Sequence, residues 1–352
     1  MTATRPFDGL PFTARNLLAP MEGVTEPCFR DLVLARNTPG HLGGAFTEFV
    51  RVVRHALPAR TLREHLGTRR FGAPVGLQLM GADLAALAET ARRAIDVGAP
   101  LVDLNFGCPA KGAIAGCAGS ALLKDPRSVE EVVAACRGAV DRASDPAIPV
   151  TAKIRAGYDD DRLLEDLARA AEAGGAAMLT VHCRTRAEAY QDEVDWSRIA
   201  RAVRAVSIPV CGNGGIGVHA DFERMRSETG AALAMVGRGA LADPWIFSGV
   251  RVTAADAARF LLDYADALGA QSVAGPRGAA GRLKQLLRHW TAGDLVGDDR
   301  ESWMREPDPE TLFARLEEIA GVHRDARLNP LLPAPRKDLR CSTPAPVSSP
   351  SS

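Results

Sequence analysis

Several short apolar segments of the sequence end in side chains that could bind a ligand or move a proton. Amide, ammonium and imidazole groups follow four of these segments, at Gln78, Asn105, Lys153 and His182. Such a set suits the polar edge of a heterocycle with carbonyl oxygens and ring nitrogens, and a flavin ring has that edge. A lysine there would stabilise the negative charge of a reduced flavin, which is the role predicted for Lys153. His182 alone fits a core histidine equally well, but its position two residues before Arg184, at a segment end, favours a role in the site.

Two glycine-rich turns predict a site for an anion. One turn spans residues 212–215 and the other residues 237–239, which include Arg238. Because glycine has no Cβ, backbone N–H groups can approach an anion closely in such turns. Either cluster by itself could be a plain tight turn, but two clusters after the last two apolar segments favour a phosphate. A phosphorylated cofactor or substrate is therefore expected.

Cys108 is the main candidate for proton transfer by a thiol. It lies in the sequence NFGCP, and a Gly/Ala-rich segment over residues 111–120 predicts a mobile loop above the site. A thiol beside a reduced flavin can act as a general acid. Cys117, in the same loop, is the weaker alternative. Three further cysteines lie in apolar surroundings and are expected to be small core residues: Cys28, Cys136 and Cys211.

The apolar segments alternate with stretches of helical periodicity, which is typical of βα units around a parallel sheet. The predicted strands are residues 16–20, 44–48, 75–80, 101–105, 150–154, 178–182, 209–213 and 233–237. Eight such units predict an α/β fold, a (β/α)8 TIM barrel over residues 1–250. In that fold the C-terminal ends of the strands form the active site, so the residues named above should come together.

The alternation of strand and helix patterns ends after residue 250. Helical patterns at 254–268, 281–290 and 309–319 occur without a strand signal and predict a small helical domain over residues 251–329. Residues 330–352 are rich in Pro and Ser and poor in large apolar side chains, so a disordered tail is expected.

Composition argues against several classes of protein. Seven cysteines without a CxxC pair indicate reduced thiols rather than disulfides or a metal site. No apolar run approaches the roughly 18 residues of a membrane span, and residues 1–12 lack the pattern of a signal peptide, so a cytoplasmic protein that contacts no membrane is expected. A monomer is also expected.

The charge balance bears on nucleic-acid binding. The chain has 43 basic and 43 acidic residues, and a net charge of zero lowers the expectation of a nucleic-acid partner. Locally, however, residues 273–290 contain four basic residues and no acidic one. Further arginines fall near the predicted strand ends: Arg51, Arg54, Arg155, Arg184 and Arg186. The sequence therefore predicts a basic groove on a neutral protein.

Eight motifs in order resemble the tRNA-dihydrouridine synthases, flavin enzymes that reduce uridine in the D-loop region of tRNA. They are APMEGVTEPCFR (19–30), LQLMG (77–81), VDLNFGCPAK (102–111), LLKDP (122–126), KIRAG (153–157), VHCRT (181–185), GNGGI (212–216) and GRGAL (237–241). The resemblance extends over about residues 17–316. Gly215 stands where an acidic residue is common in that family, and Phe106 where Cys or Met is frequent.

The resemblance implies FMN as the cofactor and NADPH as the reductant. The flavin would deliver hydride to C6 of the uracil, and Cys108 would protonate C5. The uridine would have to leave its stack to reach the flavin. FMN would be held by Pro20, Met21, Glu22, Gln78, Lys153, His182, Asn213, Gly214, Gly215, Gly237 and Arg238.

Within that family, TEFVRVV (47–53) resembles the bacterial C-type branch, whose members act on uridine 16. The tRNA contacts implied by this similarity are Arg51, Asn105, Lys111, Arg184, Tyr190, Arg282 and Lys284. A flavin barrel that acts on a free pyrimidine or dihydropyrimidine is the alternative, although it would need no helical appendage. A tRNA-binding protein without redox activity and a barrel lyase with a phosphate site are more distant alternatives. Glu48 is either a buried structural acid or a residue of the site.

Overall fold

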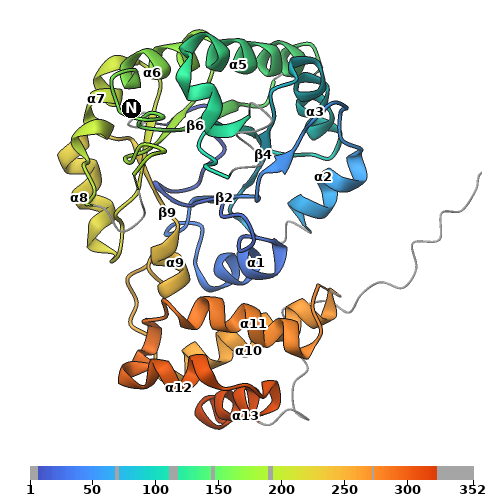
Figure 1. Ribbon diagram of the computed structural model, residues 1–352, viewed down its shortest axis with the longest axis vertical. Coiled ribbons are helices and arrows are strands. Elements are labelled where there is room, and N and C mark those ends of the chain that lie inside the picture. The colour runs from blue at the N-terminus through green and yellow to red at the C-terminus, as the bar shows by residue number, and fades with distance from the viewer. Residues whose placement is uncertain are drawn as a thin grey trace, which may run out of the picture.

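The computed structural model describes residues 7–67, 71–110, 118–143, 147–188, 193–271 and 273–322. Among them, eight parallel strands close into a barrel, because β1 pairs with both β2 and β9, and β2 also pairs with β4 (Figure 1). This confirms the predicted TIM barrel and all of its strands. The strands are β1 (Asn16–Leu18), β2 (Gly44–Phe46), β4 (Val75–Met80), β5 (Val102–Asn105), β6 (Val150–Arg155), β7 (Leu179–His182), β8 (Val210–Asn213) and β9 (Leu233–Val236).

One further strand was not predicted. β3 (Val50–Arg51) is two residues long and pairs with the end of β4, so that Arg51 lies opposite Met80. It is too short to show a period in the sequence.

Helices follow the strands and cover the outside of the barrel (Figure 1). Local signals set where they begin: the Asp83 carboxylate accepts from the Ala86 amide at 2.9 Å before α3, and Asp125 precedes Pro126 at the start of α5. The helices of this layer are α1 (Pro27–Arg36), α2 (Ala59–Leu66), α3 (Leu84–Asp96), η1 (Gly119–Lys124), α5 (Pro126–Asp141), α6 (Leu164–Ala173), α7 (Ser197–Ala205), α8 (Ala220–Thr229) and α9 (Arg238–Ala242).

The inside of the barrel has an apolar part and a polar part. Apolar side chains from β1, β2, β8 and β9 form a separate core cluster, which includes Leu17, Phe46, Cys211 and Leu233. On neighbouring strands, Gln78 lies opposite Asp103, and Asp103 lies opposite Thr151, all three buried. Asn105 and Lys153 lie opposite each other two residues further along β5 and β6. A buried polar layer therefore lies beneath the strand ends.

The chain continues after the barrel into helices that lie beside α1 and α9 (Figure 1). Their core includes Trp290 and Trp303, and Phe29 of α1 packs edge-on against Phe260 and Tyr264 of α10. These elements are α10 (Ala254–Ala270), α11 (Pro276–Leu287), η2 (Ala292–Asp294), η3 (Gly297–Asp299), α12 (Arg300–Arg305) and α13 (Pro309–Ala320).

The helix expected over residues 281–290 was misplaced. α11 begins at Pro276, because proline suits the first turn of a helix, and it ends three residues before position 290. The predicted tail, residues 330–352, lies outside the described residues. No helix in the described part of the chain is long and apolar enough to cross a membrane.

Candidate active site

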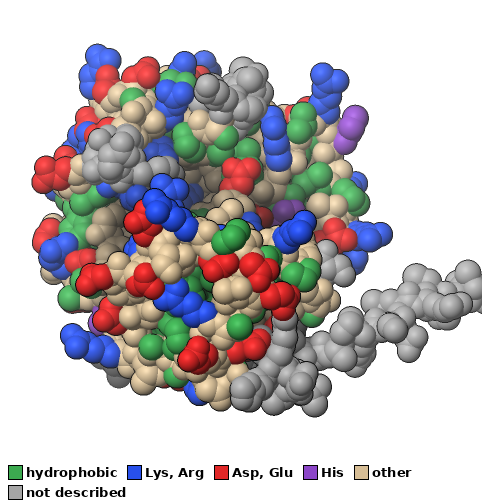
Figure 2. Space-filling view, turned by 60° about the horizontal axis from the view of Figure 1, so that its bottom comes forward, with side chains coloured by type: hydrophobic (Ala, Val, Ile, Leu, Met, Phe, Trp, Pro, Cys, Tyr) green, Lys and Arg blue, Asp and Glu red, His purple; other side chains and the backbone are tan. Residues whose placement is uncertain are grey.

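A cavity of about 820 Å³ opens at the C-terminal ends of the barrel strands. Figure 2 shows a hollow between the barrel and the C-terminal helices, with Lys and Arg side chains along part of its edge. The strand ends supply most of the lining, as the fold predicts. Among the residues predicted for the site, the cavity is lined by Pro20, Met21, Glu22, Asn105, Cys108, Lys153, His182, Arg184, Asn213, Gly214, Gly215, Gly237 and Arg238.

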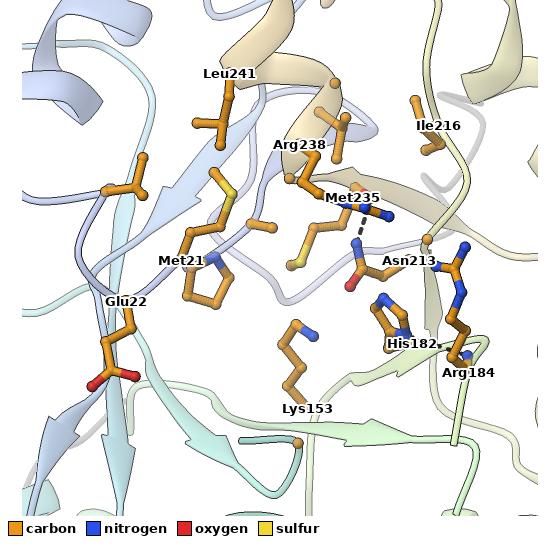
Figure 3. Close-up of a pocket in the computed structure, with 18 of the residues that line it drawn as sticks. Met21, Glu22, Lys153, His182, Arg184, Asn213, Ile216, Met235, Arg238 and Leu241 are labelled. Carbon is orange, nitrogen blue, oxygen red and sulfur yellow. Dashed lines mark hydrogen bonds between the residues drawn. The ribbon is translucent and has the colours of Figure 1, made fainter. Parts of the chain in front are cut away.

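Lys153, His182 and Asn213 form the floor of the cavity. Figure 3 shows the three side chains directed into the same space from β6, β7 and β8. Burial, followed by the positive charge of the neighbouring Arg155, lowers the pKa of Lys153 to about 8, against the opposing effect of Asp103. An amine that titrates near neutral pH can still carry its proton when an anionic ligand binds beside it.

The His182 ring is neutral. Burial, followed by the positive charges of Lys153 and Arg155, holds its pKa well below the usual range. The amide of Arg184 donates to His182 Nδ1 at 3.2 Å, so that nitrogen is the acceptor and Nε2 carries the proton. Asn213 Nδ2 donates to the Met235 carbonyl at 2.8 Å, which leaves Oδ1 as an acceptor. The floor therefore combines donors and an acceptor in a fixed arrangement.

The glycine turn after β8 requires glycine for two reasons. Gly214 and Gly215 have φ angles of +109° and +77°, which side chains other than glycine rarely adopt. A Cβ at Gly214 would lie 2.7 Å from Cys183 Sγ, and one at Gly215 would lie 2.8 Å from a methyl carbon of Val194. An acidic side chain in place of Gly215 would therefore have no room here.

Cys108 lies on the wall of the cavity with 7% of its surface exposed. Burial raises the pKa of its thiol, and a hydrogen bond from the Ala110 amide only partly offsets this. The thiol is therefore protonated at neutral pH. Asn105 Oδ1 accepts from the amides of Gly107 and Cys108 at 2.9 and 3.0 Å, which fixes the start of this loop. The site thus holds a protonated thiol beside a polar floor and two glycine-rich turns.

Sequence comparisons bear on what this arrangement does. The sequence model of the family described as dihydrouridine synthase (Dus) matches residues 17–267. The chain belongs to the dihydrouridine synthase family. The family name denotes saturation of the C5–C6 double bond of uridine, so the protein is an oxidoreductase that acts on a CH–CH bond.

Curated family members share a substantial part of the sequence. The tRNA-dihydrouridine(16) synthase of Cupriavidus necator is 41% identical over 245 residues, 68% of this chain and 74% of that protein. The protein of the same name from Pseudomonas putida is 37% identical over 328 residues, 88% of this chain and 95% of that one. The second alignment reaches beyond the barrel into the C-terminal helices.

The loop after β1 is held rigidly in this dihydrouridine synthase. Thr25 Oγ1 accepts from the Met21 amide at 2.8 Å, and Glu48 Oε1 accepts from the Val24 amide at 2.9 Å. Glu48 is therefore a structural acid that fixes this loop. Burial, followed by the charge of Glu26, raises the pKa of Glu48. Glu22 lies at the cavity edge, with its carboxylate directed away from Lys153 (Figure 3).

Some predicted site residues lie elsewhere. Gln78 is fully buried beneath the cavity rather than on its lining, and Arg51 is exposed on β3. Arg282 Nη2 pairs with Glu26 Oε1 at 2.7 Å, and Lys284 Nζ donates to the Glu306 carbonyl. These two cations have structural partners, and their contact with tRNA stays a prediction. Lys111 and Tyr190 lie outside the described residues.

The expected basic groove differs from what the described residues form. Arg155 and Arg184 are each only 4% exposed and line the cavity instead of an outer surface. Arg155 donates to the carbonyls of Gly107 and Thr185 at 2.8 and 2.9 Å, which ties together the loops after β5 and β7. These two arginines therefore lie inside the cavity rather than on an outer groove, and for Arg155 the two backbone carbonyls account for this position.

Two contributors to the site were missed in the sequence. His289 follows α11 and lines the cavity, although it belongs to the region beyond the barrel. Asp103 lies beneath Asn105 inside the barrel, and a buried acid within a strand was the signal that could have identified it. The described residues contain no group of three or more His, Cys, Asp or Glu side chains that could hold a metal ion.

Proposed function

We propose that this protein reduces a uridine of tRNA, at position 16 of the D-loop, to 5,6-dihydrouridine, with FMN as its cofactor and NADPH as the reductant. The observation that carries this proposal is the combination of a buried, protonated Cys108 with the Lys153 floor in one cavity. The family membership and the names of the relatives support the same reaction.

The residues present fit a flavin mononucleotide. The cavity volume, about 820 Å³, falls within the range of about 300–1,000 Å³ that is usual for sites of small ligands. Lys153 Nζ has no hydrogen-bond partner among the described residues, so a ligand carbonyl would satisfy it. Pro20, Met21, His182 and Asn213 would hold the ring with it. The phosphate would lie at Gly214, Gly215, Gly237 and Arg238, where no Cβ obstructs the turn after β8.

When bound, FMN would supply the hydride for C6 of the uracil, with NADPH as the reductant. The Cys108 thiol supplies the proton for C5, which its raised pKa keeps in place until it is needed. The Lys153 ammonium and the His182 Nε2–H stabilise negative charge on the neighbouring ligand. Arg155 holds the loop that carries Cys108 through the Gly107 carbonyl.

The base of the target uridine must leave its stack to enter such a cavity. Arg51, Asn105, Lys111, Arg184 and Tyr190 are the proposed contacts to the nucleotide and its neighbours. Arg282 and Lys284 would add contacts from α11. Since tRNA and NADPH are cytoplasmic, we expect the protein to act in the cytoplasm, and we expect a monomer.

The test uses purified protein with its bound flavin. Absorbance in the flavin bands should be present, and FMN should be released on denaturation. Incubation with NADPH and unmodified tRNA should give dihydrouridine at position 16, mapped by mass spectrometry, and a transcript with cytidine at that position should give none. Turnover of free uracil or orotate without any change in tRNA would instead support the small-molecule flavoenzyme. Colourless protein would refute the redox reaction.

A further inference from the structure

A chain of hydrogen bonds begins with a carboxylate inside the barrel. Gln78 Nε2 donates to Asp103 Oδ2 at 2.6 Å, and Thr151 Oγ1 donates to Asp103 Oδ1 at 2.6 Å. The three side chains lie opposite one another on β4, β5 and β6, and none is more than 1% exposed. Both oxygens of Asp103 therefore act as acceptors.

Asn105 carries the chain to the catalytic loop. Its Nδ2 donates to Gln78 Oε1 at 2.8 Å, and its Oδ1 accepts from the amides of Gly107 and Cys108. A carboxylate within the barrel is thus linked through two side-chain amides to the backbone of the proton donor.

The groups at both ends, the Asp103 carboxylate and the backbone amides, determine the direction of these hydrogen bonds. An ionised carboxylate only accepts, so Gln78 must turn its NH2 toward Asp103 and its oxygen toward Asn105. Backbone amides only donate, so Asn105 must turn its oxygen toward Gly107 and Cys108. Neither amide can flip without placing two acceptors or two donors face to face.

We propose that Asp103 is a positioning residue for the reaction: through Gln78 and Asn105 it fixes the backbone of Cys108, so that the thiol stays on the cavity wall. The role of the thiol rests on the proposed function, whereas the hydrogen-bond chain can be tested apart from it. Cys108 itself remains the catalytic residue, and Asp103 is not one of the residues that line the cavity.

The charge of Asp103 supports this role. Burial raises its pKa to about 6, against the opposing effects of Gln78, Thr151 and Lys153. Asp103 is therefore ionised at pH 8, where it can only accept.

The test reverses the direction of the hydrogen bonds that run through Gln78. In Asn105→Asp, an oxygen of the new carboxylate faces the Gln78 oxygen, and Gln78 cannot flip because Asp103 is also an acceptor. Adding Asp103→Asn removes this conflict: Gln78 can then turn its NH2 outward and accept from the new amide at position 103. The double variant moves one carboxylate by two residues and should restore a satisfied set of hydrogen bonds through Gln78, the side chain that joins positions 103 and 105.

The readout is the rate at which iodoacetamide alkylates Cys108 in the flavin-loaded protein at pH 8, followed on the Cys108 peptide by mass spectrometry. Asn105→Asp should accelerate alkylation roughly tenfold, because residue 105 loses its hydrogen bond to Gln78 and no longer fixes the loop as firmly. The double variant should return to within about threefold of the parent protein. A profile between pH 6.5 and 9 separates a changed thiol pKa, which moves the midpoint, from loop opening, which raises the plateau.

Gln78→Met provides a second test, because it keeps the length of the side chain but removes both hydrogen bonds that Gln78 makes, to Asp103 and to Asn105. These two bonds are called the relay below. Alone it should accelerate alkylation about as much as Asn105→Asp does, which also tests the proposal if Asn105→Asp fails to fold in a melting experiment. In the Gln78→Met background, Asp103→Asn should no longer rescue Asn105→Asp. The proposal would be overturned if Asp103→Asn still rescued Asn105→Asp in the Gln78→Met background, or if Gln78→Met alone were alkylated at the rate of the parent protein.

Dihydrouridine formation is measured in parallel. The relay predicts a loss of about 10- to 100-fold in kcat for Gln78→Met, the effect expected when a reacting group is misplaced by about 1 Å. If the parent protein makes no dihydrouridine, the proposed function fails while the alkylation series still tests the relay.

Discussion

The thiol of Cys108 suits a proton donor because burial keeps it protonated. A thiol that attacks as a nucleophile would need the opposite, a pKa lowered by neighbouring cations. Asn105 and Arg155 hold the backbone around the thiol, at the Cys108 amide and at the Gly107 carbonyl. At the scale of single residues, these features support the proposed role of Cys108 as a general acid.

Cys108→Ala should leave FMN bound and nearly abolish dihydrouridine formation, because only the proton donor is lost. The flavin absorbance per protein and the dihydrouridine content of tRNA measure the two effects. Cys136→Ala is the matched control, since this buried cysteine of α5 lies outside the cavity and should affect stability alone. Full activity of Cys108→Ala would transfer the acid role to Cys117.

Flavin affinity should depend on the charge of Lys153. Its pKa is about 8, so the ammonium predominates below pH 8 and the neutral amine above it. FMN affinity should therefore fall as the pH rises through about 8. Lys153→Met should weaken FMN binding about tenfold or more at pH 7, the effect of losing a hydrogen bond to a charged group, and should flatten the profile. Equilibrium titration of apoprotein with FMN measures both, and a variant with parental affinity would refute the role.

At the scale of elements, α11 connects the C-terminal helices to the loop after β1. Arg282 pairs with Glu26, donates to the Gly23 carbonyl, and reaches the Tyr264 hydroxyl at 3.3 Å. Tyr264 in turn donates to Glu26 at 2.6 Å. The loop that carries Met21 is thereby fastened to helices outside the barrel.

Arg282→Met should lower the free energy of unfolding by about 1–3 kcal/mol, because it leaves Glu26 partly buried without its cation. Glu26→Gln should have a similar effect, and the double variant should lose less than the sum of the two. Urea unfolding of the tRNA-free protein measures the series. Reduced tRNA affinity with unchanged stability in Arg282→Met would show that this arginine serves only the contact with tRNA.

The sequence predicted the strands better than the helices beyond the barrel. Strands such as β4 and β6 are buried on both faces, so their apolar runs are continuous and their ends are clear. α11 was misplaced because its first turn, PRGA, contains few large apolar residues. β3 was missed because two residues show no period.

At the scale of the whole molecule, many of the 43 basic residues pair locally with acidic ones. Arg198 and Arg201 on α7 both pair with Asp161, and Arg92 and Arg93 on α3 both pair with Glu89. The cations available to a polyanion are therefore fewer than the sequence indicates. Arg51 beside the Cys108 wall and Arg288 beside His289 are exposed near the cavity.

Arg51→Gln and Arg288→Gln should each weaken tRNA binding and reduce the slope of log affinity against log salt by about 1, if each cation meets a phosphate. Filter binding over a range of KCl concentrations gives both quantities. Arg204→Gln on α7 is the charge-matched control and should change neither. If all three variants keep the slope of the parent protein, the tRNA binds on another surface.

The part of the site that sequence could predict consists of residues at strand ends, because the fold dictates where those ends meet. Lys153, His182 and Asn213 are examples. His289 could not be placed, since its position depends on how α11 packs beside α9. The inward direction of Arg155 depends on which carbonyls lie within reach, and residue type does not reveal that.

The closure of the barrel has a consequence for synthesis of the protein. β1 is completed by β9, and Arg15 near the N-terminus donates to the carbonyl of Ala232 at 2.8 Å. Until β9 has left the ribosome, Pro20 and Met21 of a nascent chain lack the part of the cavity wall formed by Gly237 and Arg238. His289 emerges later still. Cofactor loading must follow nearly complete translation, so ribosome-bound chains that stop before residue 233 should be colourless.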